Sequence, residues 1–251
     1  MKRIKSQSLS NEVKAEIYQY IKTTFDGVNN KLPTEEQFAQ RLGVSRITIR
    51  TALNELASEG IILRRQGRGT FINPQALSMK VSFNPVSLFS DMIKQCGFQP
   101  GIRLLESSET TADQKLADHL LIEPGTPVMI TRKIFFADQK PCAYCVDYFS
   151  TGLLESPADL DYLKNYPESL FDFLEQCCGQ KITWDKTEIA TTTNQNEKML
   201  TDIFQCGKKI RSFLRLDCIN FNSEDRPVVY AHEYIDTDYI QFNIIRQKAG
   251  I

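Results

Sequence analysis

The stretch LPTEEQFAQRLGVSRITIRTALNELASEGIILRRQGRGTFI, residues 32–72, decides the fold of the first part of the chain. Thr34 followed by Gln37 is a capping-box pattern, which predicts the start of a short helix that Gly43 ends. After a brief turn, Ser45 is the expected N-cap of a longer helix. The apolar residues of that helix share one face, which we expect to be buried: Ile49, Ala52, Leu53 and Leu56.

The segments on either side of these helices complete one small domain. Downstream, residues 61–65 and 70–72 have the composition of two strands, joined by a tight glycine-containing turn at residues 66–69. Upstream, apolar residues recur at every fourth position and predict an amphipathic helix of about four turns: Val13, Ile17, Ile21 and Phe25. A helix, a short helix, a turn, a long helix and a hairpin, in this order, form a winged helix-turn-helix.

The third helix of such a domain fits the major groove of B-DNA, where side chains near its N-terminus reach the base edges. Here the outer face of that part carries Arg46, Thr48 and Arg50. Arginine makes bidentate bonds to guanine or charge-assisted bonds to phosphate. Arg65 and Arg68 flank the turn of the hairpin, or wing, where they can enter a minor groove or bind phosphate. The alternative is a winged helix that only contacts proteins and whose arginines are solvated.

Residues 32–72 closely resemble the DNA-binding domain of the GntR family of bacterial transcriptional regulators. The resemblance implies DNA contact by the helix and also by the wing-tip pair Gln66 and Gly67. One position departs from the family pattern, because Glu36 stands where members often carry a DNA-contacting arginine, and this predicts an altered binding sequence. The expected DNA-contacting residues are Ser45, Arg46, Thr48, Arg50, Arg65, Gln66, Gly67 and Arg68.

The chain of 251 residues is long enough for two domains, and its charge is divided unevenly along its length. Residues 1–74 carry 12 Lys and Arg against 7 Asp and Glu, whereas residues 75–251 carry 18 against 24. A basic N-terminal part on an acidic body indicates that the N-terminal part meets a polyanion.

Several classes of protein are not expected. No apolar run approaches the roughly 18 residues of a membrane span, and the basic N-terminus lacks the apolar stretch of an export signal. We therefore expect a cytoplasmic protein with reduced cysteines, no membrane partner and no cofactor. Among the seven cysteines, Cys142 and Cys145 form a lone C-x-x-C pair. We expect small core residues on a strand there and no metal, the alternative being a metal or redox role.

The pattern beyond residue 80 changes to alternating strands with few helices. Strands are expected over residues 103–110, 128–137, 142–149, 186–193, 210–222 and 228–234, and helices over 88–96, 112–120, 170–177 and 197–204. Strands outnumber the crossover helices, so we expect an α+β domain with an antiparallel sheet. The predicted division is a winged helix-turn-helix at residues 1–73, a linker at 74–80 and this α+β domain at 81–251.

This order of elements resembles the UTRA effector domain of the HutC subfamily of GntR regulators, which has a chorismate-lyase-like fold. The resemblance rests on LADHLLIEPGTPVMITRKIFFADQKPCAYCVDYF (116–149), ESLFDFLEQCCGQKITWDKTEI (168–189) and SEDRPVVYAHEYIDTDYIQF (223–242). It implies that the domain binds a small metabolite, often a sugar phosphate or related organic acid. It also implies that the bound metabolite shifts the affinity for DNA.

The polar residues that relatives use to hold a phosphorylated sugar are largely replaced in this chain. Lys133 and Phe135 stand where such members commonly show Arg-x-Arg, and Cys145 stands for a common glutamate. On the last strand, Val229 replaces a glutamate and Ile235 a tyrosine. These replacements disfavour a phosphosugar and favour a less charged, partly aromatic or apolar ligand.

Some polar groups remain as candidates for the ligand site. Strand alternation places Glu233 on the same face as Val229 and Ile235. Ser169 precedes a helix, whose first N–H groups can bind an anion. Each candidate also has an ordinary structural role open to it, as a cap, a packed ring or a solvated charge. The expected effector-binding residues are Phe89, Ser90, Lys133, Phe135, Cys145, Ser169 and Glu233.

The predicted function is therefore a repressor that binds DNA as a homodimer. Since one winged helix covers one half-site, a two-fold dimer suits a palindromic operator with half-sites about 34 Å apart or a multiple of this. Three alternatives stay open: an enzyme of the lyase type, an architectural DNA binder without effector, and an activator. The only two histidines, His119 and His232, form no catalytic pattern, so we expect no enzyme activity.

Overall fold

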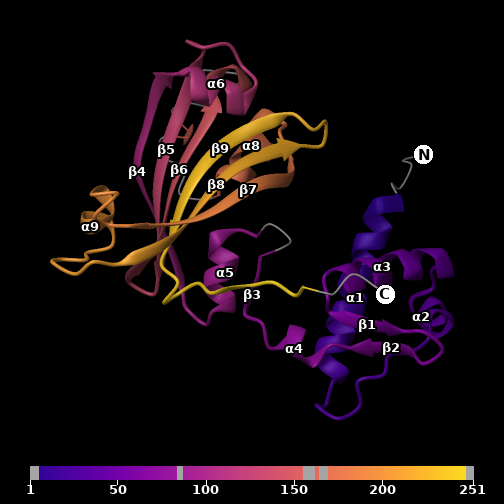
Figure 1. Cartoon of the computed structure of the whole chain (residues 1–251). Helices are drawn as coiled ribbons and strands as arrows, with labels where there is room; N and C mark the ends of the chain where they lie inside the picture. Colours follow the sequence, from indigo (N-terminus) through magenta and orange to yellow (C-terminus); the bar gives the residue numbers. More distant parts are fainter. Residues whose placement is uncertain (1–5, 84–86, 155–161, 164–168, 247–251) are drawn as a thin grey trace. The chain divides into compact units, whose positions relative to one another are not determined.

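A computed structural model describes residues 6–83, 87–154, 162–163 and 169–246 (Figure 1). The expectation that the chain has no export signal rests partly on residues 1–5, which lie outside the described residues. The chain divides into two compact units, residues 1–84 with 243–251, and residues 85–242. Within the described ranges, no helix has the length and apolar composition needed to cross a membrane.

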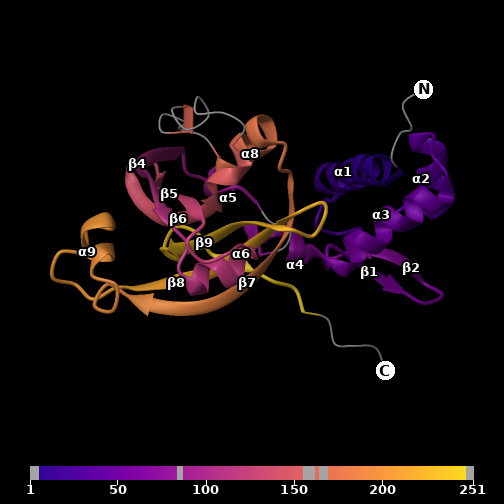
Figure 2. The ribbon, with the colours of Figure 1, turned by 90° about the horizontal axis from the view of Figure 1, so that it is seen from above.

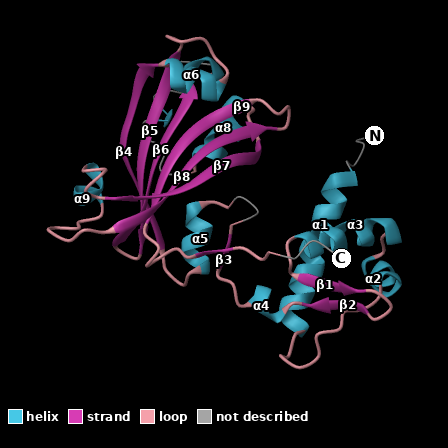
Figure 3. Ribbon diagram, viewed as in Figure 1, coloured by secondary structure: helices cyan, strands magenta, loops and turns pink. Residues whose placement is uncertain are grey.

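The first unit contains the elements predicted for a winged helix-turn-helix (Figure 3). Three helices, α1 (Ser6–Thr24), α2 (Glu35–Leu42) and α3 (Arg46–Ser58), precede an antiparallel hairpin of β1 (Ile62–Arg65) and β2 (Gly69–Ile72). A β-bridge from Lys31 to Phe71 adds a third short segment to the hairpin. The predicted order of elements is confirmed.

The turn between α2 and α3 is fixed by caps that the sequence predicts. Thr34 and Gln37 form a full capping box, with each side chain accepting a hydrogen bond from the other residue's backbone N–H. Gly43 ends α2 in the left-handed region at φ 65°, which glycine adopts without strain. Two residues later, Ser45 caps α3 by accepting from the Thr48 N–H over 3.1 Å. The direction of α3 relative to α2 is therefore set locally.

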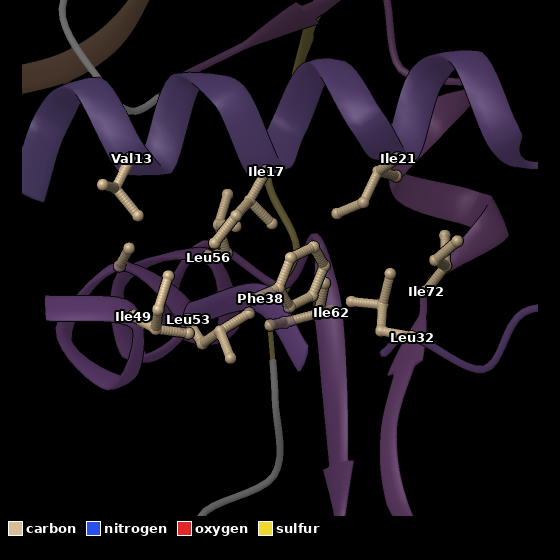
Figure 4. Packing of buried hydrophobic residues seen from close by; sticks show 11 residues of the cluster. Val13, Ile17, Ile21, Leu32, Phe38, Ile49, Leu53, Leu56, Ile62 and Ile72 are labelled. Carbon is tan, nitrogen blue, oxygen red and sulfur yellow. The ribbon is translucent and has the colours of Figure 1, made fainter. Parts of the chain in front are cut away.

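One apolar core holds these elements together. Figure 4 shows α1 lying across the hairpin and α3, with its apolar side chains directed at theirs. The rings of Tyr20 and Phe38 pack edge to face, with their centroids 5.5 Å apart. On the rim, Lys14 forms ion pairs with Glu55 and Glu59. The buried cluster is Val13, Ile17, Ile21, Leu32, Phe38, Ile49, Ala52, Leu53, Leu56, Ile62 and Ile72.

Two further short elements follow the hairpin, one in the region predicted as a linker, residues 74–80, and one directly after it. One helical turn, α4 (Pro74–Leu77), is capped by the Asn73 side chain, and β3 (Val81–Ser82) comes next. Strand β3 pairs with β10 (Phe242–Asn243) from the other end of the chain. The linker prediction covered α4 but gave no sign of either strand.

The C-terminal segment also packs on the winged helix. Gly60, with φ 73°, follows α3, and a Cβ added to it would lie 2.5 Å from Cγ2 of Ile245. Backbone therefore meets a side chain there at a distance that only glycine permits. The Phe83 N–H donates to the Asn243 carbonyl over 2.9 Å. The chain thus runs from one unit to the other twice, at residues 84–85 and at residues 242–243.

The second unit is built on one antiparallel sheet of six strands in the order β4-β5-β6-β9-β8-β7 (Figure 1). Five antiparallel pairings between adjacent strands connect all six strands. The strands are β4 (Pro100–Thr111), β5 (Pro127–Ala137), β6 (Lys140–Ser150), β7 (Ile182–Thr193), β8 (Ser212–Asn222) and β9 (Pro227–Ile235). The predicted α+β class with an antiparallel sheet is confirmed.

Helices cover both faces of this sheet (Figure 2). On one face lie α5 (Phe89–Gln95) and α8 (Leu170–Cys178), and on the other lies α6 (Gln114–Leu120). The α6 face is lined by Val128 and Tyr230, and the same face packs α9 (Met199–Ile203) against Tyr144 and Tyr234. The α5 face carries the polar residues described below. A single turn of 3-10 helix, η1 (Thr151–Leu153), follows β6.

Candidate DNA-binding surface and ligand site

The outer face of the first turns of α3 combines a charged and an apolar side chain. Arg46 is exposed and has no hydrogen bond or ion pair to any residue that the structure describes. Ile47 follows it and is 76% exposed, although the isoleucine two residues later is fully buried. Guanidinium groups bond to guanine or phosphate, and apolar side chains contact the methyl group of thymine. This face has the chemistry of a helix that reads base edges.

The predicted contact residues Ser45 and Thr48 already take part in the helix cap. Their hydroxyl oxygens lie 2.8 Å apart, and the Ser45 oxygen also accepts the Thr48 N–H. The pair fixes the start of α3. A phosphate oxygen can bind at such a helix start.

Arg50 is held by a residue of the neighbouring helix. Its Nε donates to Oε2 of Glu35 over 3.0 Å, and its Nη2 lies 3.0 Å from the same oxygen. The other oxygen of Glu35 lies 3.6 Å from Nη2 of Arg64 on β1. One carboxylate thus positions an arginine of α3 and an arginine of the wing strand, while both arginines remain partly exposed.

The wing tip is exposed and basic. Arg65 lies over the ring of Phe71, with its guanidinium carbon 5.0 Å from the ring centroid. The Arg68 N–H donates to the Arg65 carbonyl over 3.0 Å and closes the turn, within which Gly67 has φ 69°. Gln66 is exposed at the same turn. The turn therefore presents two guanidinium groups beside Gly67, which has no Cβ to keep a partner at a distance.

The structure places the predicted DNA-contacting residues on two segments of one domain, the start of α3 and the tip of the wing. Sequence reasoning missed three residues beside them: Ile47, Glu35 and Arg64. Helical periodicity turns Ile47 away from the buried stripe, so its exposure was readable from the spacing. The pairing of Glu35 with two arginines depends on the packing of three elements and left no sign in the sequence.

The predicted ligand residues of the second unit gather on the α5 face of the sheet. Lys133, Cys145 and Glu233 are direct neighbours across β5, β6 and β9, so their side chains share this face. Phe135 lies one step further along β5, and its ring packs on Phe89 of α5 with the centroids 4.6 Å apart. Five of the seven predicted residues therefore surround one region.

Lys133 and Asp147 form the charged centre of this region. Their side chains are only 2% and 6% exposed. Burial lowers the pKa of Lys133, and the neighbouring Asp147 carboxylate opposes this effect. Burial also raises the pKa of Asp147, against the Lys133 charge and two hydrogen bonds. Those bonds come from the Thr131 hydroxyl and the Cys145 thiol, each over 3.1 Å.

Glu233 stands apart from these satisfied groups. No residue in the described ranges makes a hydrogen bond or an ion pair with its carboxyl group. Burial raises its pKa to about 8, helped by the negative charges of Asp147 and of Asp185 on β7. The side chain nevertheless keeps some accessible surface. A surrounded carboxyl that retains accessible surface faces a space that small molecules such as water can enter.

Other polar groups of the face complete its chemistry. Asp185 accepts from the Thr187 hydroxyl over 3.0 Å, and burial raises the pKa of this carboxyl. Ser107 on β4 lies opposite Thr131, and its buried oxygen has no hydrogen-bond partner among the described residues. Cys218 on β8 lies beside Thr187, and burial raises the pKa of its thiol. The face is polar and in part unsatisfied.

Two predicted ligand residues make no hydrogen bond to this cluster within the part of the chain that the structure describes. Ser169 caps α8, its oxygen accepting from the Phe171 N–H over 3.1 Å. Ser90 lies on α5 and is partly buried. Sequence reasoning missed Thr131, Asp147 and Asp185. The first two lie two residues from Lys133 and Cys145 on the same strands, so strand alternation was a usable signal.

The cysteine pair and the two histidines lie in packed surroundings. The Cys142 thiol donates to the Phe135 carbonyl over 3.4 Å, and burial raises its pKa to about 12. Burial raises the pKa of Cys145 further above its ordinary value. On the opposite face, the His119 ring stacks on Tyr230 and Nδ1 of His232 lies 2.5 Å from Asp217. Each group is engaged by packing or by a specific partner.

Comparison with known proteins bears on both units. The family model of bacterial regulatory proteins of the gntR family matches residues 9–72. The UTRA domain model matches residues 95–241, which is more than half of the chain. The two matched ranges contain every predicted DNA-contacting residue and, apart from Phe89 and Ser90, every predicted ligand residue.

Curated relatives and solved structures span nearly the whole chain. An uncharacterized HTH-type transcriptional regulator, YurK of Bacillus subtilis, is 25% identical over 222 residues, 85% of each protein. The "Probable fructoselysine utilization operon transcriptional repressor" of Shigella flexneri is 25% identical over 244 residues, 96% of this chain and 93% of that protein. The crystal structure of the possible transcriptional regulator YydK from B. subtilis matches with a TM-score of 0.72 at 17% identity. It covers 95% of this chain and 99% of that one.

Proposed function

Because this chain belongs to the UTRA-domain proteins and its winged helix matches the family model of gntR bacterial regulatory proteins, we propose that it is a repressor with a metabolite-controlled affinity for its operator. In this proposal the protein is a cytoplasmic member of the HutC subfamily and not an enzyme. The division into a DNA-binding domain at residues 1–73, a linker at 74–80 and an effector and dimerisation domain at 81–251 belongs to the same proposal.

The observation that carries the proposal is the outer face of α3. Arg46 is unpaired within the described residues, Ile47 is 76% exposed, and Arg50 is oriented by Glu35. A helix in the major groove uses both side-chain types, because arginine bonds to guanine or phosphate and an apolar side chain contacts the methyl group of thymine. The residues we assign to DNA contact are Ser45, Arg46, Ile47, Thr48, Arg50, Arg65, Gln66, Gly67 and Arg68.

One winged helix reads only one half-site, so we propose a two-fold homodimer on a palindromic operator. The half-sites then lie about 34 Å apart, or a multiple of this distance. Repression follows if both third helices enter the DNA at once and the bound dimer excludes the transcription machinery.

We place the effector on the α5 face of the sheet, beside Phe89, Phe135, Lys133, Cys145 and Glu233. Both connections between the two units involve short strands, β3 and β10, that pair with each other. In this proposal a ligand that displaces one connection also displaces the other, because the two strands are paired. A coupling free energy of about 1–3 kcal/mol is enough for a roughly 5- to 150-fold change in DNA affinity.

The name of the relative in S. flexneri concerns the use of fructoselysine, a sugar joined to an amine. The relative is only 25% identical, so its name suggests a ligand class to test rather than a ligand. Fructoselysine also fits the replacement of phosphosugar-binding residues by Lys133, Phe135 and Cys145.

The direct test is recovery of the operator. Sheared genomic DNA is passed over the purified chain, the retained fragments are sequenced, and the enriched sequence is footprinted. We expect a protected palindrome with two half-sites and release of the DNA by a metabolite extract of the same cells. Protection without release by any extract indicates an architectural binder, and no enrichment of any sequence contradicts the proposal.

A further inference from the structure

The α5 face of the sheet holds more acidic than basic groups. Three carboxyl groups, Asp147, Asp185 and Glu233, share the face with one lysine, Lys133. Lys133 neighbours Asp147, so the positive charge of the site is already matched by one carboxylate. The other two carboxyl groups, Asp185 and Glu233, then have no buried cation beside them in the described part of the chain.

The three carboxyl groups differ in how they are satisfied. Asp147 accepts from Thr131 and Cys145, and Asp185 accepts from Thr187. Glu233 has no such partner within the described residues, although protein surrounds its carboxyl group and the side chain keeps accessible surface. An enclosed carboxyl without a partner is costly to fold unless something else binds it. Glu233 lies within the pairing of β6 and β9, opposite Cys145, and its carboxyl group is open to a ligand that supplies the missing partner.

We propose that the effector carries a positively charged nitrogen that binds between Glu233 and Asp185, with its apolar part against Phe135 and Phe89. This inference rests on the proposed function, because it takes the α5 face as the effector site. A cation supplies the partner that Glu233 lacks, since it neutralises a carboxylate and donates hydrogen bonds. A phosphate or carboxylate ligand meets three acidic groups and one lysine that is already matched.

The titratable groups that face Glu233 come from four neighbouring strands. They are Lys133 on β5, Cys145 and Asp147 on β6, Asp185 on β7 and Cys218 on β8. Among them only Lys133 adds positive charge, and burial raises the pKa of both thiols, so they stay neutral. The pKa of Glu233 is raised to about 8, so this carboxyl is largely protonated at lower pH. A cation binds most tightly when the carboxyl is ionised. Affinity for a cation of fixed charge therefore rises with pH up to about 8.

The test uses two matched series of probes that differ mainly in charge. The first is 2-phenylethylamine, 2-phenylethanol and phenylacetate, and the second is glucosamine, N-acetylglucosamine and glucose 6-phosphate. Thermal unfolding of the full chain is measured with each probe for the wild type, Glu233→Gln and Glu188→Gln. Glu188 is exposed on β7 and lies on the opposite face, across from Asp217, so its substitution is the matched control.

We expect the amine of at least one series to raise the unfolding temperature of the wild type and of Glu188→Gln. The same amine should bind Glu233→Gln at least ten-fold more weakly than the wild type, or not stabilise this variant at all. Asp185→Asn should reduce the affinity for the amine by a smaller factor. Binding of 2-phenylethylamine should be tighter at pH 8.5 than at pH 6.5. A larger effect of a neutral or anionic member overturns the inference, as does the absence of any effect of either amine.

The unfolding curves without probe show whether each variant is folded. The measurement needs no DNA, so its outcome is independent of whether the chain binds an operator. A phosphate or neutral probe that stabilises the protein and releases the operator leaves the proposed regulator in place and removes only the cationic ligand.

Discussion

Arg50 of α3 and Glu35 of α2 are joined by two contacts of 3.0 Å to one carboxylate oxygen. The second oxygen of Glu35 faces Arg64 of the wing strand at 3.6 Å. A carboxylate on a surface proposed to bind DNA repels phosphate, so its presence there has to serve another purpose. We interpret it as an orienting group that limits Arg50 to one direction and keeps it from binding any phosphate nearby.

Glu35→Gln should therefore increase affinity for non-specific DNA and reduce the ratio of specific to non-specific binding. The loss of one negative charge favours the polyanion, and Arg50 loses its orientation. Fluorescence anisotropy with operator and scrambled duplexes at several salt concentrations measures both quantities. Glu16→Gln removes the same charge from an exposed position on α1 and should change neither. An unchanged ratio in Glu35→Gln contradicts the orienting role.

Ile47 and Leu53 lie on the same helix with opposite surroundings, since the first is 76% exposed and the second 1%. Leu53→Ala should lower the free energy of unfolding of the first unit by roughly 2–5 kcal/mol, because it leaves a cavity in the core. Ile47→Ala should leave stability nearly unchanged but weaken operator binding. Chemical unfolding and anisotropy separate the two effects. If Ile47→Ala keeps full operator affinity, Ile47 is not at the DNA interface.

The wing arginines should act on affinity more than on sequence preference. Arg68→Ala removes a guanidinium at the tip of the hairpin without touching the core of the domain. If Arg68 binds phosphate, the slope of log affinity against log salt falls by about 1, and operator and scrambled duplexes are affected alike. Arg226→Ala, an exposed arginine in the turn between β8 and β9, is the control. A slope identical to that of the wild type removes Arg68 from the interface.

Glu233 predicts a pH dependence of stability in the absence of ligand. Its pKa is raised in the folded chain to about 8 from an ordinary value of 4.5. The folded state therefore holds this proton more tightly, and the resulting stabilisation is complete below pH 4.5 and lost as pH rises to 8. Relative to Glu233→Gln, the wild type should lose up to about 4 kcal/mol across this window. Denaturant titrations from pH 5 to 9 measure the difference, and parallel curves contradict the raised pKa.

The N-terminal domain was predictable from the sequence because its signals are local. The capping box of Thr34 and Gln37, the Ser45 cap and the αL glycine Gly43 each act within four residues. Once they fix the helix boundaries, the spacing of the apolar residues determines which faces pack together. The positions of Arg46 and of the wing tip follow directly from that arrangement.

The candidate ligand site was only half predictable, because it depends on register between distant strands. Alternation along β9 predicted that Glu233 shares a face with Val229 and Ile235, and the strand pairings agree with this. That Glu233 lies beside Cys145 and near Asp147 depends on how β6 pairs with β9, which spacing along either strand does not fix. The same limit applies to β3 and β10, which are two residues each and far apart in the sequence.

The central claim, that the start of α3 reads duplex DNA, is tested most directly by Arg46→Ala. Its affinity for the recovered operator is compared by anisotropy with that of the wild type and of Arg226→Ala. We expect Arg46→Ala to lose roughly 1–3 kcal/mol of binding free energy on the operator and much less on a scrambled duplex. Arg226→Ala should match the wild type. Operator binding by Arg46→Ala equal to that of the wild type would contradict the claim.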